Sequence, residues 1–121
     1  MIDPEACQAA EASQPPTPVQ SPEACQTMAQ VRAGVDATDR KLSRLIARRF
    51  AYMDAAARIK SDRSHVRDEA RKADVVRNAA TNAVADGWPP LVATALWDQL
   101  VEASIAYEFD AFDRITTSVV D

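Results

Sequence analysis

The sequence predicts an all-α protein, and two observations support this fold class. Apolar residues recur at helical spacing in three long segments, and no segment shows the alternation that is typical of a strand. The 121 residues contain only two glycines and many residues that favour helix. The length suggests one domain. Residues 1–20 hold four of the seven prolines and are predicted to be a flexible tail, so the helical domain is expected over residues 21–121.

The first helical segment sets the expected architecture. Apolar residues keep helical spacing from about Thr27 to Asp62, and only Gly34 weakens this stretch. Roughly 36 helical residues span ~54 Å, whereas a domain of this size has a radius of gyration of only ~13 Å. A helix of this length overhangs any monomer that the chain can build. We therefore expect its apolar stripe to be covered by a second copy, in an intertwined helical homodimer.

Two further helices are expected. Asp68 or a near neighbour is placed to cap the second, which should run to about Ala85. The segment Asp86-Gly87-Trp88-Pro89-Pro90 is typical of a stop followed by a turn. A third helix is expected from about Leu91 to Ile115.

The charge and composition argue against several kinds of partner. The net charge of −4 argues against a large nucleic-acid surface. No apolar run approaches the ~20 residues of a membrane span, and the N-terminus lacks the features of a signal peptide. Cys7 and Cys25 are too few for a disulfide framework or a zinc site. We therefore expect a cytoplasmic protein with free thiols.

Two cations lie where core residues of the first helix are expected. Arg49 and Lys60 fall on the seam that continues through Leu42, Ile46, Met53 and Ala56. Their directions differ by about 20° around the axis, and their Cα atoms are ~16 Å apart along it. Either residue alone is most simply a side chain that buries its stem and keeps its charge in water.

The other helices carry polar residues of the same kind. Ser104 and Glu108 are one turn apart on an otherwise apolar seam, and Arg71 lies in the first turn of the second helix. Taken singly, Ser104 is a small contact residue, Glu108 an ion-pair partner and Arg71 a solvated charge. Taken together, several cations directed into one helical core imply an anionic ligand, because unpaired buried charges are destabilising.

Other polar residues are given no such role. His65 is interpreted as a solvent-facing loop histidine, since no partners offer a catalytic triad. Arg48, Arg58 and Arg63 are interpreted as surface charge.

The ordered spacing of these charges resembles that of the all-helical chorismate mutase family, and most of all its isochorismate pyruvate lyase branch. The resemblance covers about residues 21–115. It rests on VR...VD..D, RRF.YM.AA.RIK and VRDEAR, on the SPEAC stretch before them, and on the series Arg32, Arg49, Lys60, Arg71, Ser104 and Glu108.

The resemblance implies a role for each residue. Arg49 would bind one substrate carboxylate, and Arg32 would reach another from the partner subunit with help from Arg71. Lys60 would donate to the enolpyruvyl ether oxygen. The second donor to that oxygen is usually Gln in this family, and the chain has Glu108 there.

The hydroxyl-bearing side of the ring would be lined by Ser104 and Asp68. Bacterial mutases of the family often carry Glu directly after the position of Arg71, where this chain has Lys72. This departure bears on how the ring hydroxyl is recognised.

The implied reaction needs no nucleophile, metal or cofactor. Chorismate rearranges to prephenate through a cyclic transition state, so the enzyme fixes a conformer and stabilises charge on the ether oxygen. We expect a chorismate mutase. The alternative in the same pocket is an isochorismate pyruvate lyase, which forms salicylate and pyruvate. A more distant alternative is a non-catalytic helical dimer used for regulation or partner binding.

Overall fold

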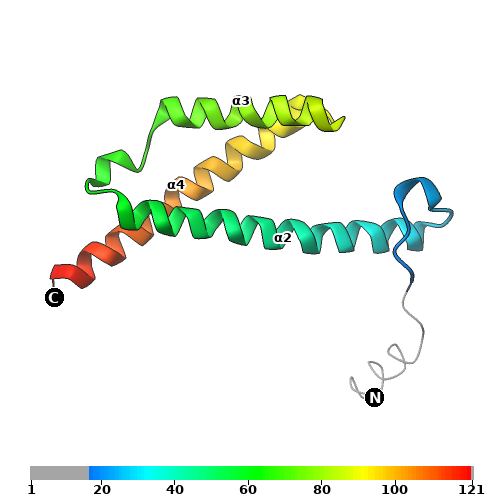
Figure 1. Cartoon of the computed structure of the whole chain (residues 1–121), viewed down its shortest axis with the longest axis horizontal. Coiled ribbons are helices and arrows are strands. Elements are labelled where there is room, and N and C mark those ends of the chain that lie inside the picture. Colours follow the sequence, from blue (N-terminus) through cyan, green and yellow to red (C-terminus); the bar gives the residue numbers. More distant parts are fainter. Residues whose placement is uncertain (1–16, 121) are drawn as a thin grey trace, which may run out of the picture. The chain divides into compact units, whose positions relative to one another are not determined.

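The computed structural model describes residues 17–120, with side chains described up to Thr117 (Figure 1). Over this range the helices are α2 (Met28–Ile59), α3 (Glu69–Asp86) and α4 (Pro90–Val120), with short 3-10 turns η1 (Pro22–Ala24) and η2 (Arg63–His65). No strand occurs among these residues, which confirms the predicted all-α class with a very long first helix. The predicted tail lies largely outside the described residues, as does Cys7, so the boundary at residue 20 stays a prediction.

A capping box fixes the start of α2. Thr27 Oγ1 accepts a hydrogen bond from the Gln30 amide at 3.2 Å. In return, Gln30 Oε1 accepts from the amides of Thr27 and Gln26, at 3.2 and 2.7 Å. These reciprocal bonds satisfy amides that have no partner within the helix, so α2 begins here.

The end of α2 comes slightly earlier than the sequence predicts. The helix ends at Ile59 rather than near Asp62, although the Lys60 amide still donates to the Ala56 carbonyl at 2.9 Å. The Asp62 side chain instead accepts hydrogen bonds from the amide and the hydroxyl of Ser64, and it caps the η2 turn. A short side-chain acceptor that binds its own backbone favours a turn over a continued helix.

The turn between α3 and α4 has the form that the sequence predicts. Gly87 has a positive φ of 81°, which glycine adopts without strain, and it caps α3. The Trp88 amide donates back to the Ala83 carbonyl at 3.0 Å, and Pro90 then opens α4. Helix α4 extends to Val120, beyond the predicted end near Ile115, because no Gly or Pro interrupts it there.

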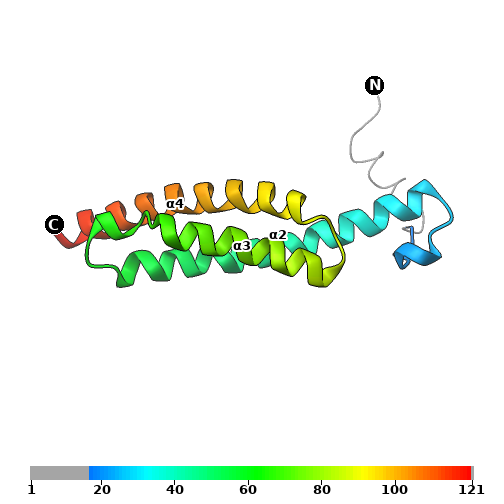
Figure 2. The same ribbon diagram turned by 90° about the horizontal axis from the view of Figure 1, so that it is seen from above.

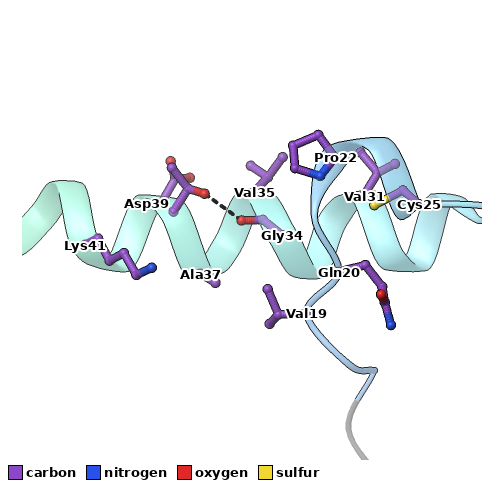
Figure 3. Close-up of a pocket in the computed structure, with 11 residues that line it drawn as sticks. Val19, Gln20, Pro22, Cys25, Val31, Gly34, Val35, Ala37, Asp39 and Lys41 are labelled. Atoms are coloured by element: carbon purple, nitrogen blue, oxygen red, sulfur yellow. Dashed lines mark hydrogen bonds between the residues drawn. The ribbon is translucent and has the colours of Figure 1, made fainter.

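The chain divides into two compact units, Met1–Ile46 and Ala47–Asp121. In the first, the segment around Val19 and Gln20 runs beside the first turns of α2, with the η1 turn above it (Figure 3). Together they line a cavity of about 360 Å³ that is mostly apolar and includes the half-buried, free thiol of Cys25.

The second unit contains the end of α2 together with α3 and α4. Helix α4 leaves the Gly87 turn and runs obliquely from α3 toward the C-terminal end of α2 (Figure 1). In the view from above, the helix axes of this unit appear nearly parallel (Figure 2). Near the turn, α3 and α4 approach closely because their facing residues are small; these are Ala79, Ala83 and Ala93, flanked by Trp88 and Trp97. Farther along, the core consists of Val66, Val101 and Ile105, packed against Val75, Phe109 and Phe112.

Candidate active site

A second cavity, also of about 360 Å³, lies within the unit Ala47–Asp121. The end of α2, the connection to α3, the start of α3 and the middle of α4 all contribute to it. Its polar lining consists of Arg49, Lys60, His65, Asp68, Arg71, Lys72, Ser104 and Glu108. Six of the seven site residues named from the sequence are therefore neighbours around one cavity.

Arg49 is held in place by α4. Its guanidinium donates to Ser104 Oγ at 2.5 Å, and the hydroxyl donates in turn to the Leu100 carbonyl at 2.6 Å. Ser104 is buried, so this chain of hydrogen bonds sets the direction of the arginine. Burial lowers the pKa of Arg49, and the positive charge of Arg71 lowers it further. Two guanidinium groups thus face the same space and repel each other.

Both guanidinium groups lack a carboxylate partner within the part of the chain that the structure describes. Among the side chains that the structure describes, no Asp or Glu forms an ion pair with Arg49 or Arg71. Paired forks of this type bind carboxylates and phosphates through parallel hydrogen bonds. The cavity therefore has the charge and the donors to bind an anion.

Lys60 and Glu108 form an ion pair at the cavity wall. Lys60 Nζ lies 2.6 Å from Glu108 Oε1, and the Glu108 residue is 3% exposed. The approach is close, but its angles are not those of a hydrogen bond, and Oε1 has no hydrogen-bond partner among the described residues. The Lys60 charge is therefore the partner that compensates the burial of this oxygen.

Asp68 combines a structural and a lining position. It is the N-cap of α3, and its Oδ1 accepts from the Arg71 amide at 2.9 Å. The cap fixes the first turn of α3, so it also fixes where Arg71 leaves the backbone. The sequence predicts both the cap and the place of Asp68 beside the cavity.

Lys72 is turned toward α4 although it lines the cavity. Its ammonium group lies 3.1 Å from Asp98 Oδ1 and 2.9 Å from Glu102 Oε2. Glu102 also accepts from both terminal nitrogens of Arg67. These two cations lower the pKa of Glu102 to about 2, while their carboxylate partners raise the pKa values of Lys72 and Arg67.

Arg32 is the one predicted site residue that does not line this cavity. It is exposed, and it belongs to the unit Met1–Ile46. Its predicted role in the site of a partner subunit depends on assembly.

Sequence reasoning missed part of the lining. His65 is exposed, as expected, but it borders the cavity instead of facing only solvent. Its position between Lys60 and Asp68 in the chain was the available signal. The apolar walls include Met53, Ala56 and Val101, whose seams the sequence revealed, and Val66, Val75 and Ile105.

The described residues hold no cluster of three or more His, Cys, Asp or Glu that could bind a metal ion. Among the helices described, none is long and apolar enough to cross a membrane.

A comparison with curated proteins gives no match. In a comparison with known families, residues 31–109 match the family described as chorismate mutase type II. This match spans more than half of the chain and includes all seven site residues named from the sequence, so the protein belongs to the chorismate mutase type II family.

Proposed function

We propose that the protein is a chorismate mutase, an isomerase that converts chorismate to prephenate. The observation that carries this proposal is the meeting of Arg49, Arg71 and Lys60 at one cavity, where both guanidinium groups lack a carboxylate partner among the described side chains. Chorismate is a dianion of a size that such a cavity accommodates. Membership of the chorismate mutase type II family supports the same activity.

Each residue then has a distinct part in the reaction. Arg49, oriented by Ser104, binds one carboxylate of the substrate, and Arg71 assists Arg32 of the partner subunit at the other. Lys60 donates to the ether oxygen, which gains negative charge as its bond to the ring breaks. Fixed donors of this kind stabilise charge that develops in a transition state.

Glu108 is the second group placed near that oxygen. A protonated carboxyl donates a hydrogen bond, whereas an ionised one repels the growing negative charge. The close approach of Glu108 to Lys60 means that the ether oxygen meets both side chains together. The apolar walls, with Met53 and Val101 among them, exclude water and favour the compact conformer that the rearrangement needs.

The second candidate is an isochorismate pyruvate lyase that uses the same cavity. Isochorismate differs from chorismate in the position of the ring hydroxyl, and it loses pyruvate through a similar cyclic geometry. The residue after Arg71 is Lys72, bound to Asp98 and Glu102, in place of the glutamate that the bacterial mutases often carry. This difference on the hydroxyl side of the ring supports the lyase as the second candidate.

Two assays separate these activities. Purified protein is mixed with chorismate, and the loss of its absorbance is followed. The same protein is then given isochorismate, and salicylate fluorescence is followed. Faster turnover of chorismate, measured as kcat/KM, supports the mutase, and the reverse order supports the lyase. Turnover of neither substrate contradicts both and favours the non-catalytic dimer.

We further propose that the active form is an intertwined homodimer in the cytoplasm, with Arg32 of each chain completing the site of its partner. Large apolar side chains along the first part of α2 support a covering partner; these are Val31, Val35, Leu42, Leu45 and Ile46, all more than a third exposed. Their spacing places most of them on one face of the helix. A second copy of the same helix would cover this face.

A further inference from the structure

We propose that Arg63 is a positioning residue for the reaction. It clamps the connection between α2 and α3, residues 60–68, onto α4, and it thereby holds Lys60 and His65 in place at the cavity. The inference rests on the proposed function, since it assigns Arg63 a part in that same site.

The clamp combines an ion pair with an aromatic contact. Arg63 Nε lies 2.9 Å from Asp113 Oδ1, and its Nη2 lies 3.3 Å from Oδ2. The guanidinium carbon lies 4.4 Å from the ring centroid of Phe109. An isolated surface ion pair contributes little. A two-pronged pair on an aromatic face is more directional, because both the edge and the plane of the guanidinium are held.

Both contacts of Arg63 are with the helix that carries Glu108. Phe109 follows Glu108 directly, and Asp113 lies just over one turn further along α4. Lys60, which forms the ion pair with Glu108, lies at the start of the connection. The clamp therefore ties the connection that carries Lys60 to the helix that carries Glu108.

Hydrogen bonds and burial within the rest of the connection support this contact. Asp62 accepts from the Ser64 amide at 2.9 Å and from its hydroxyl at 2.8 Å, which shapes the turn that presents Arg63. Val66 is 3% exposed and anchors the far end of the turn in the core that Phe109 covers. With one end buried, the outer part of the turn depends on Arg63, so the clamp controls how Lys60 and His65 border the cavity.

The decisive variant is Asp113→Asn, which keeps the shape of the side chain and leaves Arg63 in place. We expect kcat to fall about tenfold while KM changes by less than about threefold. A misplaced donor reduces the stabilisation of the transition state more than it reduces binding of the substrate in its ground state. Trypsin should cut after Arg63 several times faster, as judged by mass spectrometry of the fragments. Arg63→Lys retains a charge but loses the fork, so its kcat should lie between those of Asp113→Asn and the wild type.

The matched control is Asp74→Asn. It removes the carboxylate that pairs with Arg77, an exposed pair three residues apart within α3 and outside this cavity. Its kcat, its KM and its rate of cleavage after Arg63 should equal those of the wild type.

The clamp is overturned if Asp113→Asn is cut after Arg63 at the wild-type rate. The positioning role is overturned if cleavage is faster but kcat is unchanged. The cleavage assay needs no substrate, so these results are distinct from a failure of the proposed function, which appears as a wild-type protein that turns over neither chorismate nor isochorismate.

Discussion

Lys60 Nζ and Glu108 Oε1 lie 2.6 Å apart at the wall of the cavity, with the Glu108 side chain 5% exposed. Lys60 directly follows the last residue of α2, and Glu108 lies on α4, 48 positions further along the chain. A ligand oxygen that reaches the lysine also reaches the carboxyl group. The charge on Glu108 must therefore influence any chemistry that Lys60 supports.

Replacing Lys60 by alanine should reduce turnover of chorismate by about a hundredfold or more, which corresponds to the ~3 kcal/mol that a donor to a developing oxyanion contributes. The measurement is kcat, with circular dichroism to follow the helices. Loss of the cation leaves the Glu108 carboxylate buried without its partner. The Lys60→Ala/Glu108→Gln double variant controls for this effect, and it should be as inactive as the single variant. Activity within a few-fold of the wild type would contradict the assignment of Lys60.

The catalytic efficiency of the wild type should rise as the pH falls from 8 toward 5. A protonated carboxyl group at this position donates to the ether oxygen, whereas an ionised one repels it. Glu108→Gln should flatten this profile and raise kcat/KM at neutral pH, because an amide donates at any pH. The measurement is a pH series of kcat/KM for both proteins. A flat wild-type profile, or a slower Gln variant at pH 7.5, would mean that Glu108 belongs only to an ion pair.

Glu102→Gln should reveal a pH-dependent part of the stability. Arg67 and Lys72 lower the pKa of Glu102 from an ordinary 4.5 to about 2 in the folded chain. The stabilisation is therefore fully present above the ordinary pKa and is lost as the pH falls toward 2. We expect the Tm of the wild type to exceed that of Glu102→Gln by a few degrees at most at pH 6, since solvent screens these groups.

The two Tm curves should converge as the pH is lowered toward 2. Glu69→Gln is the control, because Glu69 is more exposed and pairs with Arg67 alone. Its difference from the wild type should be smaller. A constant gap between pH 7 and pH 3 would show that the Glu102 ion pairs do not stabilise the fold.

Active sites should be shared between two subunits. Arg32 precedes Arg49 by 17 residues (49 − 32), a separation of about 25 Å in helix. Arg32→Ala and Lys60→Ala chains should each be inactive alone. When they are mixed and exchanged, each heterodimer should regain one site with both residues intact, and activity should return in proportion to the heterodimer formed. Mass spectrometry verifies the exchange, and no recovery after full exchange would exclude a role for Arg32 across the interface.

Local features of this fold could be predicted from the sequence because nearby residues decide them. Asp68 caps α3 through the Arg71 amide, three residues away, and Gly87 ends the same helix by adopting a positive φ. The helical spacing of the apolar residues predicted the three helices themselves. The end of α2 was placed about three residues late, because the bonds from Asp62 to Ser64 compete with helix in a way that the apolar pattern does not register.

The contacts between helices could be decided only by the tertiary structure. Apolar seams and a family resemblance pointed to Arg49, Ser104, Lys60 and Glu108 as one group, but the Ser104 hydrogen bond depends on how α4 crosses the end of α2. The sequence interpretation of Arg63 as mere surface charge shows the same limit, since Asp113 lies 50 residues away. Polar pairs of this kind follow from crossing angles and side-chain rotamers, which a helical pattern leaves open.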